Sequence, residues 1–222
     1  MDVPPTESTP LGVEPLPLEI VRWHVIDDAI HIELFNPNYG VGLLRAEFRI
    51  AVTDEDGRVF ASLGLSGLPG TPASTILQLP PRGSYGLVDF LPALAPPVST
   101  LELSLVSGQW MDWPDVNPPL VEITEHELGA SGSRPRISGQ LEIHGGEGVF
   151  NVWVMAFVAD GDAFVVVDGV VACVEPGASV PFQTGRALSD FASGTVSRIE
   201  AYVTTVPGVP GSADGLDSPP GC

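Results

Sequence analysis

A regular alternation of apolar and polar side chains runs through the stretch Ala46-Glu47-Phe48-Arg49-Ile50-Ala51-Val52-Thr53. Phe48, Ile50 and Val52 fall on one face of an extended chain, whereas the charged side chains fall on the other. This period of two predicts an antiparallel strand with one buried face. No segment of comparable length carries the 3.6-residue apolar stripe of a helix, so the sequence predicts an all-β fold.

The landmarks around this strand recur in the same order in the second half of the chain. An acidic turn ends the long strand in both halves, at Asp54-Glu55-Asp56-Gly57 and at Asp160-Gly161-Asp162. A second strand with alternating leucines is predicted near the end of the first half, where we expect Leu101, Leu103 and Leu105 to point inward. Such internal self-similarity indicates that one domain was duplicated.

The repeat divides the chain into five parts. We expect two tandem antiparallel immunoglobulin-like β-sandwiches, repeat 1 at residues 17–113 and repeat 2 at residues 120–207. Residues 114–119 are rich in proline and predict a short, stiff linker. We expect residues 1–16 to form an extended N-terminal arm and residues 208–222 a flexible C-terminal tail.

Charge limits the classes of partner. The 9 cationic side chains are all arginine, and they face 28 Asp and Glu for a formal net charge of −19. A nucleic-acid partner is therefore excluded, because phosphate binding needs a basic surface. The sequence has no apolar run of the roughly 18 residues that a membrane span requires, so no membrane insertion is expected. The acidity fits either solubility or calcium binding.

The two copies differ most along the long strand. When Val52 is matched to Val158, a polar face of the first copy corresponds to an apolar and aromatic face of the second. The second-copy positions are Trp153, Met155 and Phe157. We predict that these side chains form a contact face that packs on repeat 1, on another copy of the chain, or on a separate protein partner. Alternatively, a register shifted by one residue makes them the core, but the strand is then still apolar on both faces.

Two other groups of residues suggest ligands. Asp54, Asp56, Asp160 and Asp162 are weak calcium candidates, although Asp and Gly are also what tight hairpins require, and neither loop has the EF-hand order of ligands. Otherwise no metal or other cofactor is expected. The indoles of Trp110 and Trp113 can stack on sugar rings, which makes a glycan ligand possible, but such residues more often fill an internal seam between domains.

A search for catalytic residues gives nothing. His31 and Glu33 share a strand face, yet no third ligand completes a metal site, so a surface histidine or one with satisfied hydrogen bonds is favoured. No serine lies in a nucleophile elbow. Cys173 lies within an apolar strand and is expected to be a small buried hydrophobe, while Cys222 ends the tail and could cross-link chains. The sequence therefore predicts a protein that is not an enzyme.

The segment Ile32-Glu33-Leu34-Phe35-Asn36-Pro37-Asn38 is followed by the alternating strand, an Asp-Gly turn and Leu68-Pro69-Gly70. In this order of motifs repeat 1 resembles the LEA-14-like (WHy) family, and it is similar to the bacterial FxLYD family. Repeat 2 fits less well, because Ile143-His144-Gly145-Gly146 replaces the Asn-Pro-Asn element. The resemblance implies an extracytoplasmic or stress-associated binding or structural domain without catalysis.

These observations lead to one functional prediction with an alternative. We expect a non-catalytic structural or protein-interaction module of a cell-envelope or extracellular assembly, binding a partner or itself through Trp153, Met155 and Phe157. The alternative is a carbohydrate- or calcium-binding β-sandwich module. The N-terminus lacks a signal peptide, so the protein is either cytoplasmic or an extracytoplasmic chain from which an anchor was removed.

Overall fold

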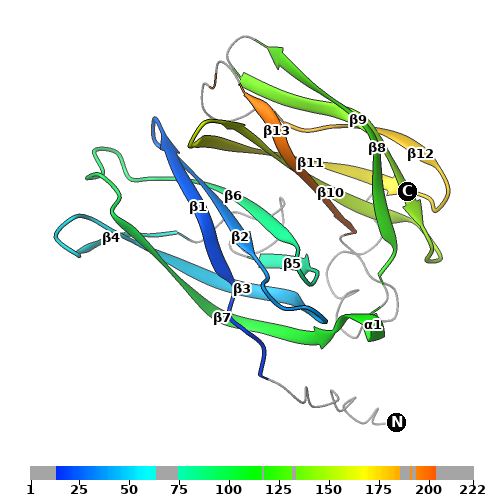
Figure 1. Ribbon diagram of the computed structural model, residues 1–222, viewed down its shortest axis with the longest axis horizontal. Helices are drawn as coiled ribbons and strands as arrows, with labels where there is room; N and C mark the ends of the chain where they lie inside the picture. The colour runs from blue at the N-terminus through cyan, green and yellow to red at the C-terminus, as the bar shows by residue number, and fades with distance from the viewer. Residues whose placement is uncertain are drawn as a thin grey trace.

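The computed structural model describes residues 14–63, 75–116, 118–131, 134–185, 191 and 194–203. These residues form antiparallel strands in four sheets and one short helix, which confirms the all-β prediction (Figure 1). No helix in this part of the chain has the length and apolar character needed to cross a membrane. Most of the predicted arm at 1–16 and the whole predicted tail at 208–222 lie outside the described residues.

The first half of the chain contributes two sheets that enclose one core. The strands are β1 (Glu19–Ile26), β2 (Ala29–Phe35), β3 (Val41–Thr53), β4 (Val59–Leu63), β5 (Thr75–Leu79), β6 (Ser84–Phe90) and β7 (Thr100–Asp112). One sheet has the order β1-β2-β6, and in the other β3 pairs with β4, β5 and β7. Phe48, Ile50 and Val52 of β3 are buried as the alternation predicts, and they pack with Ile30 and Ile32 of β2.

The second half repeats this pairing order. After helix α1 (Trp113–Val116) come β8 (Leu120–Ser131), β9 (Arg134–His144), β10 (Phe150–Asp160), β11 (Ala163–Val174), β12 (Ser179–Gln183) and β13 (Thr195–Val203). The two sheets have the orders β12-β9-β8 and β11-β10-β13. In each half, therefore, the second strand centres one sheet and the third strand centres the other.

A buried amide network closes the turn after β2. Asn36 is fully buried, and its Nδ2 donates to Val41 O at 2.9 Å and to Pro80 O at 3.0 Å. Its Oδ1 accepts from Asn38 N at 3.1 Å and from Asn38 Nδ2 at 2.8 Å. Asn38 in turn bonds both backbone polar groups of Leu16. The Asn-Pro-Asn segment thus acts through its hydrogen bonds, fixing the chain before β1 to the turn.

The connection between the halves is folded rather than extended. Residues Trp113–Val116 form one helical turn, in which Pro114 is tolerated because the first residues of a helix need no backbone N–H partner. Trp113 N donates to Gly40 O at 2.8 Å, and its ring lies so close to Gly42 that a side chain there would collide with it. Val116 is buried with Leu44 in the core of the second half. This connection therefore packs against both halves.

One predicted core position is wrong. Leu101 and Leu103 pack against the first-half core, but Leu105 is 43 % exposed. Leu105 pairs with Phe48 beside a β-bulge in β3, and β7 lies at the edge of its sheet. Because an edge strand is covered on one side only, the correct period does not guarantee burial.

Candidate functional site: the junction between the two halves

Two sheets from different halves of the chain pack face to face, and we call this contact the junction. The β1-β2-β6 sheet of the first half meets the β11-β10-β13 sheet of the second (Figure 1). The central strand of the second sheet, β10, is buried on both sides. Val152, Val154 and Val158 belong to the core of the second half, whereas Trp153 and Met155 belong to the core cluster of the first. The faces of β10 are therefore those given by matching Val52 to Val158, and not those of the register shifted by one residue.

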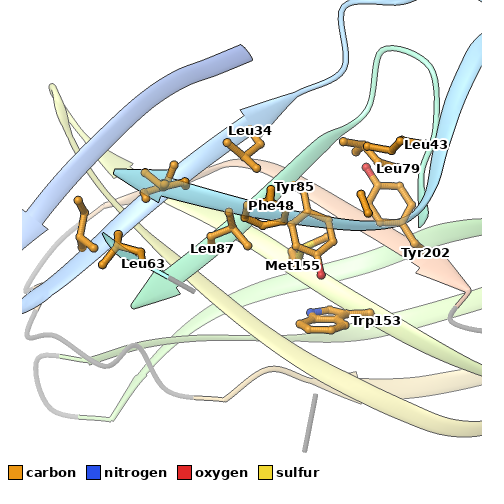
Figure 2. Close-up of a cluster of buried hydrophobic side chains, with 14 of the residues drawn as sticks. Leu34, Leu43, Phe48, Leu63, Leu79, Tyr85, Leu87, Trp153, Met155 and Tyr202 are labelled. Carbon is orange, nitrogen blue, oxygen red and sulfur yellow. The ribbon is translucent and has the colours of Figure 1, made fainter. Parts of the chain in front are cut away.

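The three side chains predicted to bind a partner lie in this junction. Trp153 is 7 % exposed, and Met155 and Phe157 are fully buried. Figure 2 shows Trp153 and Met155 beside Tyr85 and Tyr202, and the Tyr85 and Trp153 ring centroids are 5.9 Å apart. We predicted three possible packing partners for this face: repeat 1, another copy of the chain, or a separate protein. In the structure the first half of the same chain covers it. These residues are thus not free to contact a separate protein in this conformation.

Gly86 of β6 allows the sheets to come this close. A Cβ atom at this position would lie 2.5 Å from Val166 Cγ1 and 3.2 Å from Phe157 Cε1. Phe157, Val166 and Phe164 are buried together, with Val88 against them. Close approach of a strand to a facing side chain explains a glycine inside β6, where its lack of a side chain would otherwise weaken the strand.

A buried carboxylate connects the halves electrostatically. The Glu33 side chain on β2 is 4 % exposed, and its Oε2 lies 2.7 Å from Arg22 Nε of β1. Its Oε1 lies 3.1 Å from Arg198 Nη1 of β13, and Arg198 also contacts the hydroxyl of Ser84. The Arg22 guanidinium stacks 4.3 Å from the centroid of the Phe164 ring. Because a buried carboxylate that loses its partners is strongly destabilising, these contacts fix how the two sheets face each other.

His31 supplies a second polar contact across the junction. The ring is fully buried on β2, and its Nδ1 accepts a hydrogen bond from Val166 N at 3.1 Å. Burial, helped by the nearby His24, lowers the pKa of His31 to about 4. The imidazole is therefore neutral at pH 7, as its role as an acceptor requires. His31 and Glu33 share a strand face, and both contact groups of the second half.

Tyr202 and Glu200 complete the junction on β13. The Tyr202 hydroxyl lies 2.8 Å from Ser84 O and 3.1 Å from Glu200 Oε2. Burial raises the pKa of Glu200, although the Tyr202 hydrogen bond and the nearby Arg198 oppose this shift. Burial likewise raises the pKa of Asp168 on β11. Burial therefore shifts the pKa of several of the described titratable groups in and beside the junction.

The predicted calcium and glycan residues lie elsewhere. Asp54 Oδ1 accepts from Asp56 N at 3.0 Å and from Arg58 N at 2.9 Å, so this carboxylate stabilises its own turn. Asp160 and Asp162 flank Gly161, whose positive φ of 59° suits a tight hairpin. In the described ranges no three His, Cys, Asp or Glu side chains are grouped so as to hold a metal ion.

The two tryptophans proposed for glycan binding are half-buried. Trp110 packs on the first-half core and Trp113 on the second-half core, which fits the role of an internal seam. Trp113 also lines an open cleft beside α1, whereas Trp110 does not. The calcium and glycan roles stay predictions.

Cys173 differs from its prediction as a buried hydrophobe. It is exposed, has a positive φ of 61°, and is disulfide-bonded. Apart from Asp168 and Gly169 the strand is apolar, but Cys173 lies where the β10–β11 register shifts between Phe150 and Val152. Cys222 lies outside the described residues.

Comparison with known proteins assigns no family. No protein-family model matches the chain, and no curated protein matches it. The resemblance of repeat 1 to the LEA-14-like and FxLYD families therefore stays a prediction.

Sequence reasoning missed the polar half of the junction. Glu33, Ser84 and Arg198 come from strands far apart in the chain, with 165 residues between Glu33 and Arg198. The available signal was compositional. Glu33 lies in a strand, Ala29–Phe35, whose other residues except His31 are apolar, and a charged residue needs a partner when both faces of its strand are buried. That signal does not name the partner.

Replacing Gly86 with alanine tests the close approach of the sheets. We expect Gly86→Ala to lower the free energy of unfolding by about 1–3 kcal/mol, because the new methyl group overlaps Val166. Shortening Val166 to alanine in the same chain should recover part of this loss. Chemical denaturation measures both variants, and Gly40→Ala is the control, since a Cβ there meets nothing within 4 Å. Equal costs for the Gly86 and Gly40 variants would refute the contact.

His31 predicts a specific pH dependence of stability. Its pKa is about 4 in the fold against 6.5 in the unfolded chain, so the unfolded chain binds the proton more readily. The stability that neutral His31 contributes is therefore present above pH 6.5 and is lost as the pH falls toward 4. Between pH 7.5 and 5 the loss is about 2 kcal/mol.

Urea denaturation of wild type and His31→Gln at both pH values isolates this effect. The variant should lose less stability than wild type on acidification, because glutamine keeps an acceptor but does not titrate. His126→Gln, at an exposed position of β8, is the control. If wild type and His31→Gln show the same pH dependence, the histidine does not act as described.

Proposed function

We propose that this chain is a non-catalytic structural or protein-interaction module, made of two immunoglobulin-like sandwiches in tandem that form one rigid block. The junction is the observation that carries this proposal. A face of β10 that could bind another protein is buried against the first half, and Glu33 and His31 contact groups of the second half. Buried charges used in this way favour a structural role over a catalytic one.

The repeated strand order supports a tandem arrangement. The β1-β2-β6 sheet corresponds to β8-β9-β12, and the pairing of β3 with β4 and β7 corresponds to that of β10 with β11 and β13. We therefore keep the boundaries proposed from the sequence, with repeats at 17–113 and 120–207 joined by 114–119. Two facing antiparallel sheets of this size are typical of immunoglobulin-like domains.

The site of action that we propose is a cell-envelope or extracellular assembly. The resemblance of repeat 1 to the LEA-14-like and FxLYD families implies the same kind of location.

With the β10 face covered, we place the partner contact on the edge strand β7. Among the described residues β7 pairs only with β3, so the backbone groups of its other edge are open to a further strand. Residues 104–109 are exposed and carry no charge, in a chain with a net charge of −19. A long, uncharged edge fits an extended strand of a partner protein, which gains main-chain hydrogen bonds by pairing with it.

Charged substitutions on β7 test this assignment. We expect the double variant Leu105→Lys/Val106→Lys to lose its stoichiometric partner, because lysine blocks strand addition at an edge. The full chain serves as bait for an extract of the native source, and the complex is quantified by gel filtration and mass spectrometry. Leu94→Lys/Val149→Lys, which adds the same charge at exposed positions of other loops, is the control.

Both variants should melt within a few degrees of wild type, since all four positions are exposed. Retention of the same stoichiometric complex by the β7 variant would contradict the assignment. Self-association that disappears in the β7 variant alone would identify a second copy as the occupant of the edge and contradict a separate partner.

A further inference from the structure

An open cleft lies beside α1, and it shares Glu200 and Tyr202 with the junction. Its walls come from Gly40, from the end of β5 and the following loop, from α1 and the residues after it, and from β8 and β13. Trp113 forms one wall. Five prolines line the cleft, at positions 80, 81, 114, 118 and 119. Since proline has no N–H, these walls offer a ligand apolar surface and few backbone donors.

Gln78 of β5 lines this cleft, and its side chain carries a buried acceptor. The residue is 5 % exposed, and its Oε1 accepts no hydrogen bond from any residue that the structure describes. Leaving a buried amide oxygen without a donor costs about 1–3 kcal/mol, and native proteins seldom leave such groups unpaired. A ligand that donates a hydrogen bond to this atom would remove that cost.

The charges around the cleft are of one sign. Among the described residues, its lining includes the carboxyl groups of Glu122 and Glu200 but no arginine or histidine. Arg198 is the nearest cation to Glu200, with Nε 3.9 Å from Oε1. That contact is long because the same guanidinium lies 3.1 Å from Glu33 and also contacts Ser84. An anionic ligand would therefore meet no positive group in the cleft.

We propose that this cleft binds an organic cation, whose ammonium or guanidinium group donates to Gln78 Oε1 and Glu200 while its alkyl chain lies against Trp113 and the prolines. An ammonium group has three donors and no acceptor, which matches an acceptor-rich site. The indole face attracts a cation in addition. The cation belongs either to a free amine or to a lysine or arginine side chain of a protein. This inference stands on the cleft alone and does not require the β7 contact.

A titration with n-butylammonium chloride tests the proposal, with 1-butanol and glucose as uncharged probes. The side-chain amide signals of Gln78 and the indole signal of Trp113 are followed by NMR. We expect saturable shifts with butylammonium and none with the uncharged probes. Gln78→Leu removes the acceptor without changing the net charge, and it should weaken binding about tenfold.

A pair of charge-matched variants controls for general attraction to an acidic protein. Glu200→Gln and Glu127→Gln each remove one negative charge, but Glu127 is exposed on another part of β8 and does not line the cleft. Only Glu200→Gln should weaken binding strongly, and this pair decides the question if Gln78→Leu fails to fold. Equal binding by the two Gln variants, or equal binding of butanol or glucose and butylammonium, would overturn the proposal.

A terminally blocked pentapeptide with a central lysine distinguishes the two sources of the cation. Tighter binding of the peptide than of butylammonium, abolished by acetylating the lysine amine, would assign the cleft to a protein side chain. Equal or tighter binding of butylammonium would assign it to a free amine. Both results support a cation site, whereas failure of both probes to bind refutes it.

Discussion

The packing of one sheet face on another determines the rest of this structure. In an ordinary sandwich each sheet has one face toward the core and one toward water. Here β10 is apolar on both faces, and its second face needs cover. The β1-β2-β6 sheet supplies that cover, so β2 is also buried on both faces. Each half thereby completes the burial of the other.

Burial of the second faces requires polar groups to be matched across the contact. Glu33 lies between Arg22 and Arg198, and His31 accepts from Val166 N. Such directional contacts add little net stability, but they exclude sheet positions that leave a charge unpaired. Apolar area therefore supplies the attraction at the junction, and the polar contacts set the position. This division explains how an acidic chain brings its halves into one fixed arrangement.

The sequence allowed much of the local structure to be predicted, because strand periodicity is local. The buried side chains of β3 and the two apolar faces of β10 follow from alternation within single strands. The partners across the junction do not, since Glu33 and Arg198 meet only after both sheets have formed. Leu105 and Cys173 were misassigned for a related reason. Their strands have the expected pattern, but exposure depends on which neighbours cover each strand.

Residual dipolar couplings of backbone N–H groups test the fixed junction most directly. They would be measured on the full chain in an uncharged alignment medium, for strands β2 and β3 of the first half and β10 and β11 of the second. If the junction holds in solution, one alignment tensor fits all four strands in the arrangement of Figure 1. Two tensors of different magnitude or orientation would show that the halves move independently, which would contradict a fixed junction.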